Sequence, residues 1–154
     1  MYVLISVSNK TNIENISFFF IQQGYKILST SGTYNYLISH LPDQNDNIIQ
    51  ISDITQFPEI LNGRVKTLHP KIFGSLLCDK SDQKHLKDIE ENNIPNIDIV
   101  IINLYPFKDV VLNQNSSHSE IIENIDIGGH SIIRACAKNY KNILIITDPN
   151  DYHS

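Results

Sequence analysis

The 154-residue chain is poor in the residues that build cross-linked or metal-held scaffolds. Its two cysteines, Cys78 and Cys136, lie far apart and form no CxxC pair, so neither a disulfide framework nor a zinc finger is expected. Its six histidines form no HxxxH or HExxH pattern, and no metal site or cofactor is predicted. A GxSxG nucleophile elbow, a P-loop and a GxGxxG fingerprint are also missing, so these three kinds of site have no support.

Positive charge and long apolar runs are also scarce. The chain has 12 basic and 17 acidic residues, and a nucleic acid is not an expected partner because binding a phosphate backbone needs a basic face. A small phosphorylated ligand is still allowed, since one or two cations and backbone N–H groups suffice for it. The apolar stretch at the N-terminus ends at Val7 with no basic residue before it. The sequence therefore predicts no signal peptide or membrane span, and a cytoplasmic location.

Arginine and alanine are rare against a background rich in isoleucine, asparagine and lysine. The chain has 27 Ile, 17 Asn and 10 Lys but 2 Arg and 2 Ala, a bias typical of A+T-rich coding. Against that background each arginine gains weight as a functional candidate, and the two are Arg64 and Arg134. With 41% hydrophobic and 19% charged residues, the composition is that of one globular domain.

Short β-branched runs alternate with helical patterns along the chain. Strands are predicted at 2–7, 25–29, 48–51, 97–103 and 143–147, and the helical patterns cover 8–24, 33–40, 81–92, a short stretch before 126, and 130–139. This alternation predicts an α/β fold in three layers, with a mainly parallel sheet of about five strands. The stretch 52–75 has many turn signals and predicts a long ordered loop with helical turns, which is usually functional. Because the chain stops soon after a strand, the sequence indicates a domain truncated at its C-terminus.

Polar groups follow the first two predicted strands. Ligands of open parallel sheets bind beyond the carboxyl ends of the strands. The first strand leads into Ser8-Asn9-Lys10 and the second into Thr30-Ser31-Gly32-Thr33, both at predicted helix starts. Hydroxyls, backbone N–H groups and the positive end of a helix can cradle a phosphate. Both segments also have a purely structural explanation. The first could be an N-cap with a surface lysine, and the second a glycine turn with a cap.

Three later segments complete the candidate site. The irregular stretch Asn62–Pro70 concentrates two cations, a hydroxyl and an imidazole, although a solvated basic loop has the same composition. Asn103 and Tyr105 follow the strongest predicted strand, where a strand cap and a packed tyrosine are the structural alternative. Two glycines at 128–129 precede the last predicted helix and would allow a ligand to approach the backbone closely. Arg134 and Lys138 share a face of that helix, where a cation near the C-terminus is also a common structural feature.

Taken together and in order, these segments resemble one enzyme family. The motifs are SVSNKT, STSGT, FPEILNGRVKTLHPKIFG, INLYPF, ENIDIGG, IRACAKN and TDPNDY. They resemble the N-terminal IMP cyclohydrolase domain of the bifunctional AICAR transformylase/IMP cyclohydrolase family, over essentially the whole chain. The most specific are RVKTLHP, NLYPF and IDIGG. The resemblance implies a methylglyoxal-synthase-like fold and ring closure of the formamidoimidazole carboxamide ribotide FAICAR to IMP, with loss of water, in purine biosynthesis.

The resemblance also implies roles for individual residues and a partner. Catalytic roles fall on Lys66, Tyr105, Asp126 and Lys138. The nucleotide-binding set is Ser8, Asn9, Lys10, Thr30, Ser31, Gly32, Thr33, Arg64, Thr67, Asn103, Ile127 and Gly128. Asn9, Ser31 and His130 depart from the family's usual residues, and the first two bear on the phosphate contacts. Full-length members are homodimers mostly through a larger transformylase domain, which is absent from these residues.

The implied chemistry is an intramolecular attack of the carboxamide nitrogen on the formyl carbon. Asp126 and Lys138 would accept and relay the proton, while Lys66 and Tyr105 would stabilise the oxyanion. Asp126 and Lys138 are separated by about 15 Å along one predicted helix. They can meet only if they come from two protomers or if the chain before Gly128 folds back along the helix.

Two alternatives share the predicted fold. Methylglyoxal synthase would need a carboxylate base near the phosphate loops and lacks RVKTLHP and NLYPF. A nucleotide-sensing regulatory domain would not need Lys66, Tyr105 or Lys138, and would end a long chain, whereas Met1 here opens directly into the first strand.

Overall fold

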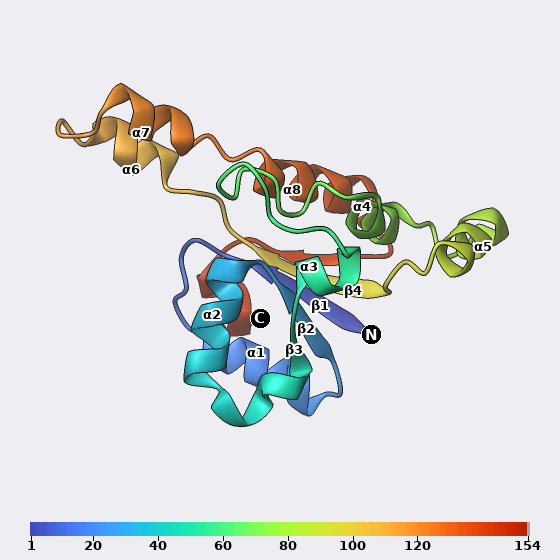
Figure 1. Ribbon diagram of the computed structural model, residues 1–154. Helices are drawn as coiled ribbons and strands as arrows, with labels where there is room; N and C mark the ends of the chain where they lie inside the picture. Colours follow the sequence, from blue (N-terminus) through green and yellow to red (C-terminus); the bar gives the residue numbers. More distant parts are fainter. Residues whose placement is uncertain (154) are drawn as a thin grey trace.

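The computed structural model describes residues 1–153 and is built around a five-stranded parallel sheet (Figure 1). The strands are β1 (Tyr2–Ser6), β2 (Lys26–Ser29), β3 (Ile48–Gln50), β4 (Ile97–Ile102) and β5 (Leu144–Ile146). Their order is β3-β2-β1-β4-β5, and every neighbouring pair is parallel. The predicted α/β class and strand number are therefore confirmed.

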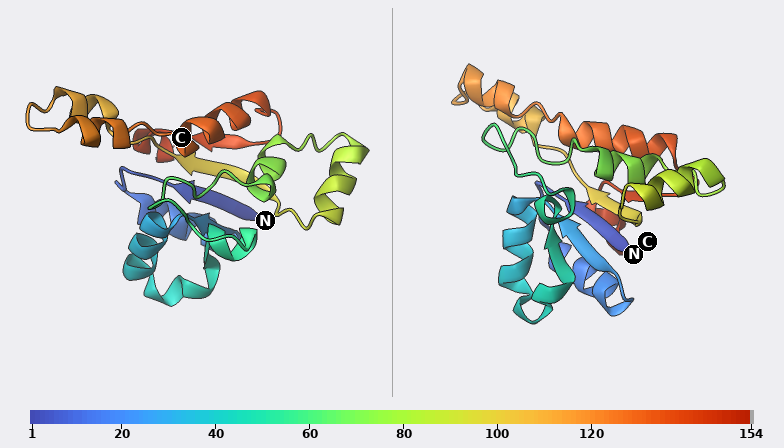
Figure 2. Two further views of the ribbon diagram at one scale, coloured as in Figure 1. Left: turned by 45° about the horizontal axis from the view of Figure 1, so that its top comes forward. Right: turned by 45° about the vertical axis from the view of Figure 1, so that its right-hand side comes forward.

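Helices cover both faces of the sheet (Figure 2). One face carries α1 (Ile13–Gln22), α2 (Ser31–His40) and the final 3-10 turn η2 (Pro149–His153). The other carries α3 (Ile51–Thr55), α4 (Pro70–Leu77) and α8 (Gly128–Lys138). A 3-10 segment, η1 (Pro42–Asn47), leads into β3. Two-sided burial explains why the central strands are almost continuously apolar.

The two faces of β1 show how one strand serves two cores. Val3 and Ile5 belong to the core beneath α1 and α2, whereas Leu4 belongs to the core beneath α4 and α8. All three side chains are 0% exposed. Successive side chains of a strand point to opposite faces, so neighbouring residues of this run contribute to opposite layers.

Three helices stand away from the sheet. The helix α5 (Gln83–Glu91) has no buried residue, and α6 (Phe107–Leu112) and α7 (His118–Glu123) form an arm that projects from the carboxyl edge of the sheet (Figure 1). A capping box between Ser117 and Glu120 starts α7. Among residues 1–153, no helix has the length and apolar character needed to cross a membrane.

The long loop predicted at 52–75 is shorter than expected. Its ends form α3 and α4, leaving 56–69 irregular. Pro70 stands at the start of α4, and His69 Nδ1 accepts the Lys71 N–H at 3.1 Å. Gly74 packs within α4, because a Cβ there would lie 2.8 Å from Ile94 Cδ1. Pro70 is part of a helix and not of the loop, because proline is well suited to a first helical position.

Several helices also begin at residues other than the predicted ones. The segment 8–11 does not open a helix, since α1 begins at Ile13 after the left-handed residue Asn12 (φ 57°). The helix α5 is capped by Asp82, whose side chain accepts the Lys84 N–H, and not by Ser81. The last helix begins at Gly128, two residues earlier than predicted. The phosphate cradle at 8–10 therefore cannot use the N-terminus of α1.

Candidate active site

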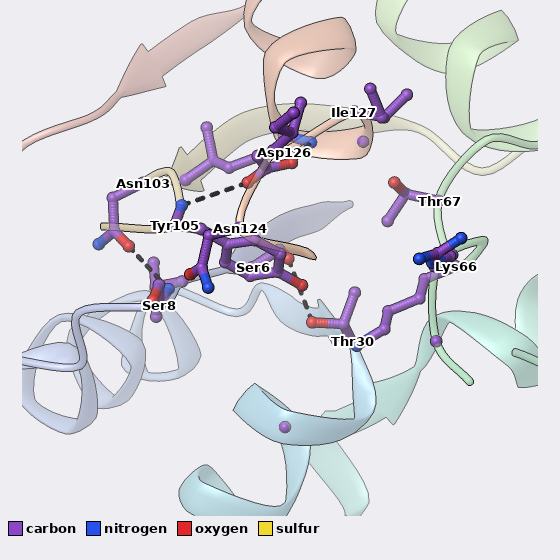
Figure 3. Close-up of a pocket in the computed structure, with 18 of the residues that line it drawn as sticks. Ser6, Ser8, Thr30, Lys66, Thr67, Asn103, Tyr105, Asn124, Asp126 and Ile127 are labelled. Atoms are coloured by element: carbon purple, nitrogen blue, oxygen red, sulfur yellow. Dashed lines mark hydrogen bonds between the residues drawn. The ribbon is translucent and has the colours of Figure 1, made fainter. Parts of the chain in front are cut away.

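A cleft of about 740 Å³ opens beyond the carboxyl ends of β1, β2 and β4, a typical size for a small-molecule site. It gathers most of the candidates from all five sequence segments. From the predicted set, the cleft is lined by Ser8, Lys10, Thr30, Gly32, Thr33, Arg64, Lys66, Thr67, Asn103, Tyr105, Asp126, Ile127 and Gly128. Asn9, Ser31 and Lys138 are not among its lining residues. Figure 3 shows Lys66 and Thr67 across the cleft from Ser8 and Asn103.

Hydroxyl groups fasten the loop after β1 to the start of α2. The Ser6 and Thr30 hydroxyls lie 3.1 Å apart. The Thr33 hydroxyl oxygen accepts the Val7 N–H at 3.1 Å and lies 3.3 Å from the Val7 carbonyl. Thr33 is only 1% exposed, so its hydroxyl holds the cleft wall together and has little surface to offer a ligand.

Asn103 fixes the loop after β1 from the other side. Its Oδ1 accepts the N–H groups of Ser8 (2.7 Å) and Asn9 (2.9 Å), and its Nδ2 donates to the Asn9 carbonyl at 2.8 Å. The Asn9 side chain is itself engaged, because its Oδ1 accepts the Thr11 N–H and hydroxyl. The structure thus gives the amide of Asn103 a loop-holding role that the sequence did not reveal.

We expect Asn103→Leu to lower the free energy of unfolding by about 1–3 kcal/mol. Leucine keeps the size but leaves the N–H groups of Ser8 and Asn9 without their acceptor. Urea unfolding measures this effect. Asn113→Leu, in the exposed connection after α6, is the control. An Asn103→Leu variant with unchanged stability would contradict this role.

The irregular segment 56–69 forms the wall opposite the β1 loop. Arg64 donates to Glu123 of α7, with Nε–Oε1 at 3.1 Å, and this bond lowers the pKa of Glu123. Both side chains are more than half exposed, so the pair contributes little to stability. Thr67 is 5% exposed and lies against the start of α8, where a Cβ on Gly128 would be 3.1 Å from its hydroxyl.

Asp126 caps the last helix at the floor of the cleft. Its Oδ1 accepts the Gly129 N–H at 2.7 Å, and its Oδ2 lies 3.4 Å from the Tyr105 N–H (Figure 3). A Cβ on Gly129 would lie 2.7 Å from Asp126 Oδ2 and 2.8 Å from Leu104 Cδ2. The absence of a side chain at Gly129 gives room to the Asp126 carboxylate, and Gly129 also lines the cleft, so the close approach of a ligand to it stays a prediction. The Tyr105 side chain is 42% exposed and lines the cleft.

Lys138 lies away from the cleft. It ends α8 and lines a separate hollow with Asp79 and Tyr140, whereas Asp126 sits at the opposite end of the same helix. The chain before Gly128 does not fold back along the helix, because Asp126 bonds to its first turn. Within one chain the predicted Asp126–Lys138 relay therefore does not form. Arg134, on the exposed side of α8, is not among the cleft-lining residues either.

Catalysis by a cysteine nucleophile and catalysis by a bound metal ion have little support in the part of the chain that the structure describes. Cys78 and Cys136 are free and buried, and burial raises the pKa of the Cys136 thiol to about 12. Such a thiol is not ionised near neutral pH and is a poor nucleophile. Within residues 1–153, no three His, Cys, Asp or Glu side chains cluster so as to hold a metal ion.

The parallel sheet and its edge cleft define a known class of domain. Residues 12–131 match the MGS-like domain family, and the chain belongs to this family. The chain is 53% identical over 149 residues to the bifunctional purine biosynthesis protein PurH of Thermoanaerobacter sp., and 47% identical over 152 residues to that of Dictyostelium discoideum. These matches cover 97% and 99% of this chain but only 28% and 27% of those proteins.

A solved structure shares the whole fold. The crystal structure of ForH superposes with a TM-score of 0.80 at 31% sequence identity, covering 99% of this chain and 74% of that one.

Proposed function

We propose that this chain is an IMP cyclohydrolase domain, which closes the ring of FAICAR to give IMP and water in the cytoplasm. The observation that carries the proposal is that one cleft gathers residues of the motifs SVSNKT, STSGT, RVKTLHP, NLYPF and IDIGG. The naming of the relatives as bifunctional purine biosynthesis proteins supports it.

The 5′-phosphate of the nucleotide fits the β1–α2 side of the cleft. Lys10 supplies a cation there, with its Nζ 3.4 Å from the Val7 carbonyl, and Thr30 and Gly32 stand at the start of α2. The N-terminus of a helix favours an anion through its N–H groups and its dipole, although at α2 the Ser31 N–H is already donated to Glu59. Arg64 and Thr67 line the opposite wall, with Ile127 and Gly128 beside them, and would hold the remainder of the nucleotide.

The ring closure needs positioning and charge stabilisation. The carboxamide nitrogen forms a bond to the formyl carbon and loses a proton, while the formyl oxygen gains a proton and becomes a hydroxyl. The hydroxyl then leaves as water with a second proton, which comes from the formamido N–H, as a C=N bond forms in the closed ring. Because both groups belong to one substrate, the cleft mainly has to hold the folded conformer. Lys66 and Tyr105 line the cleft and are suited to stabilise the negative charge on the formyl oxygen. Asp126 is the carboxylate suited to accept the proton.

Lys138 enters this proposal only through a second copy of the chain, since it lies outside the cleft of its own chain. Homodimerisation and AICAR transformylase activity would belong to a full-length protein, because this chain spans about 28% of the length of its relatives.

The names of the relatives favour neither of the two alternative functions. Methylglyoxal synthase and a nucleotide-sensing domain would both be compatible with an MGS-like domain. The relatives at about 50% identity are instead named for purine biosynthesis, and the cleft contains the Lys66 and Tyr105 that a sensing domain would not need.

The test is incubation of the purified chain with FAICAR in EDTA, followed by absorbance and chromatography. We expect IMP to form at a rate proportional to protein concentration, and calorimetry to show IMP binding in the same buffer. Dihydroxyacetone phosphate is the control substrate and should give no methylglyoxal. IMP binding without turnover would favour the sensing domain, and methylglyoxal formation would favour the synthase.

A further inference from the structure

A small hairpin within 56–69 carries Lys66 into the cleft. Ile60 and Val65 form an isolated antiparallel bridge, with N–H to carbonyl distances of 3.2 and 3.4 Å. The turn between them has three consecutive positive φ angles, the last at Gly63 (φ 83°). Residues opposite each other continue outward from an antiparallel pair, so this register sets Glu59 opposite Lys66.

The Glu59 carboxylate joins two elements that line the cleft. Its Oε1 accepts the Ser31 N–H at the start of α2 at 3.0 Å, and its Oε2 lies 3.7 Å from Lys66 Nζ. The side chains of Glu59 and Lys66 are only 24% and 28% exposed. The carboxylate thus links the hairpin base to α2.

Gly63 gives Lys66 the room to reach this carboxylate. A Cβ on Gly63 would lie 2.8 Å from Lys66 Cε and 3.3 Å from its Nζ, with Glu59 Oε2 at 3.9 Å. The positive φ of Gly63 and the absence of a side chain therefore both serve the same packing. The lysine folds across the turn and ends beside Glu59.

We propose that Glu59 is a positioning residue, which holds the Lys66 ammonium and the start of α2 in a fixed relation across the cleft. It acts through Lys66, which also shares the cleft with Lys10 and Arg64. The three cations repel one another, and the Glu59 carboxylate opposes that repulsion at Lys66 as Glu123 does at Arg64. The proposal deepens the cyclohydrolase assignment and rests on it for the role of Lys66.

Glu59→Gln separates the charge of this residue from its hydrogen bond. Glutamine keeps an oxygen for the Ser31 N–H but loses the attraction for Lys66. We expect kcat to fall roughly 10- to 100-fold, the scale of a misplaced catalytic group, with KM within about threefold and an unchanged Tm. Glu91→Gln is the matched control, because Glu91 pairs only with the exposed Lys87 at 3.6 Å in the described residues. Glu59→Asp, which keeps the charge but shortens the reach, should also lower kcat and serves if the glutamine variant does not fold.

Repeating Glu59→Gln in the Lys66→Met background tests whether Glu59 acts through Lys66. We expect Glu59→Gln to cause no further loss of kcat there, since the group it positions is gone. An equal loss in both backgrounds would overturn the proposal, as would a Glu59→Gln variant with wild-type kcat.

A readout independent of turnover keeps this test apart from that of the proposed function. Reductive ¹³C-methylation labels the lysines, and loss of one NMR signal in Lys66→Arg assigns Lys66. The proposal requires that signal to shift in Glu59→Gln and to stay in Glu91→Gln, whether or not the protein makes IMP. An unmoved signal in Glu59→Gln contradicts it.

Discussion

Lys66→Met should lower kcat for IMP formation by roughly 10²- to 10³-fold, the scale of losing one donor to a developing oxyanion. Methionine keeps much of the length of the side chain but removes the ammonium. Lys66 lines the cleft, is only 28% exposed, and is held beside Glu59, so its charge is already in place before the substrate binds. The measurement is steady-state kinetics with FAICAR, together with IMP calorimetry.

Two companion variants make this prediction specific. Lys84→Met removes a lysine from the exposed helix α5 and should leave kcat unchanged. Tyr105→Phe should cost less than Lys66→Met, because Lys66 still stabilises the oxyanion when the phenol is lost. A Lys66→Met variant whose KM rises while kcat stays at the wild-type value would assign Lys66 to substrate binding alone.

The position of the cleft could be predicted because it depends only on topology. In a parallel sheet the carboxyl ends of all strands meet at one edge. Residues as distant in sequence as Lys10 and Asp126 therefore reach the same cleft. The alternation of apolar runs and helical patterns was enough to locate that edge, and strand bounds off by one residue did not change it.

The division of work inside the cleft was not predictable from local patterns. Asn103 was predicted to contact a ligand, but its side-chain amide hydrogen-bonds the backbone of residues 8 and 9. Glu59 lies in the FPEILNGRVKTLHPKIFG motif, but no local pattern indicates a role for it. Its role follows from the register of the Ile60–Val65 bridge and from its bond to Ser31. Such roles depend on which backbone groups tertiary packing leaves without partners, and periodicity carries no information about that.

The predicted helix starts were wrong for a related reason. Proline, glycine and small polar residues signal turns, caps and first helical positions alike. At Pro70 the signal marks a helix start, whereas the Ser8–Thr11 segment is a loop that ends before α1.

Asp126→Asn should lower kcat by roughly 10²- to 10⁴-fold, the range for loss of a positioned acid–base group. The fold should survive, because the asparagine oxygen can still accept the Gly129 N–H that Asp126 accepts at 2.7 Å. The free energy of unfolding should therefore fall by no more than about 1 kcal/mol. Urea unfolding provides this control, and a large loss of stability would mean that the kinetic loss reports a damaged helix start.

The double variant Asp126→Asn, Lys138→Met tests whether these two residues form a proton relay. They lie at opposite ends of α8, and Lys138 lines a different hollow. We therefore expect Lys138→Met to change kcat by the same factor in the wild-type and Asp126→Asn backgrounds. A double variant no slower than Asp126→Asn alone would instead show that the two act as one unit. Because one chain keeps them apart, that result would require a second copy to bring its Lys138 to the cleft, and kcat would then fall on dilution below the dimer dissociation constant.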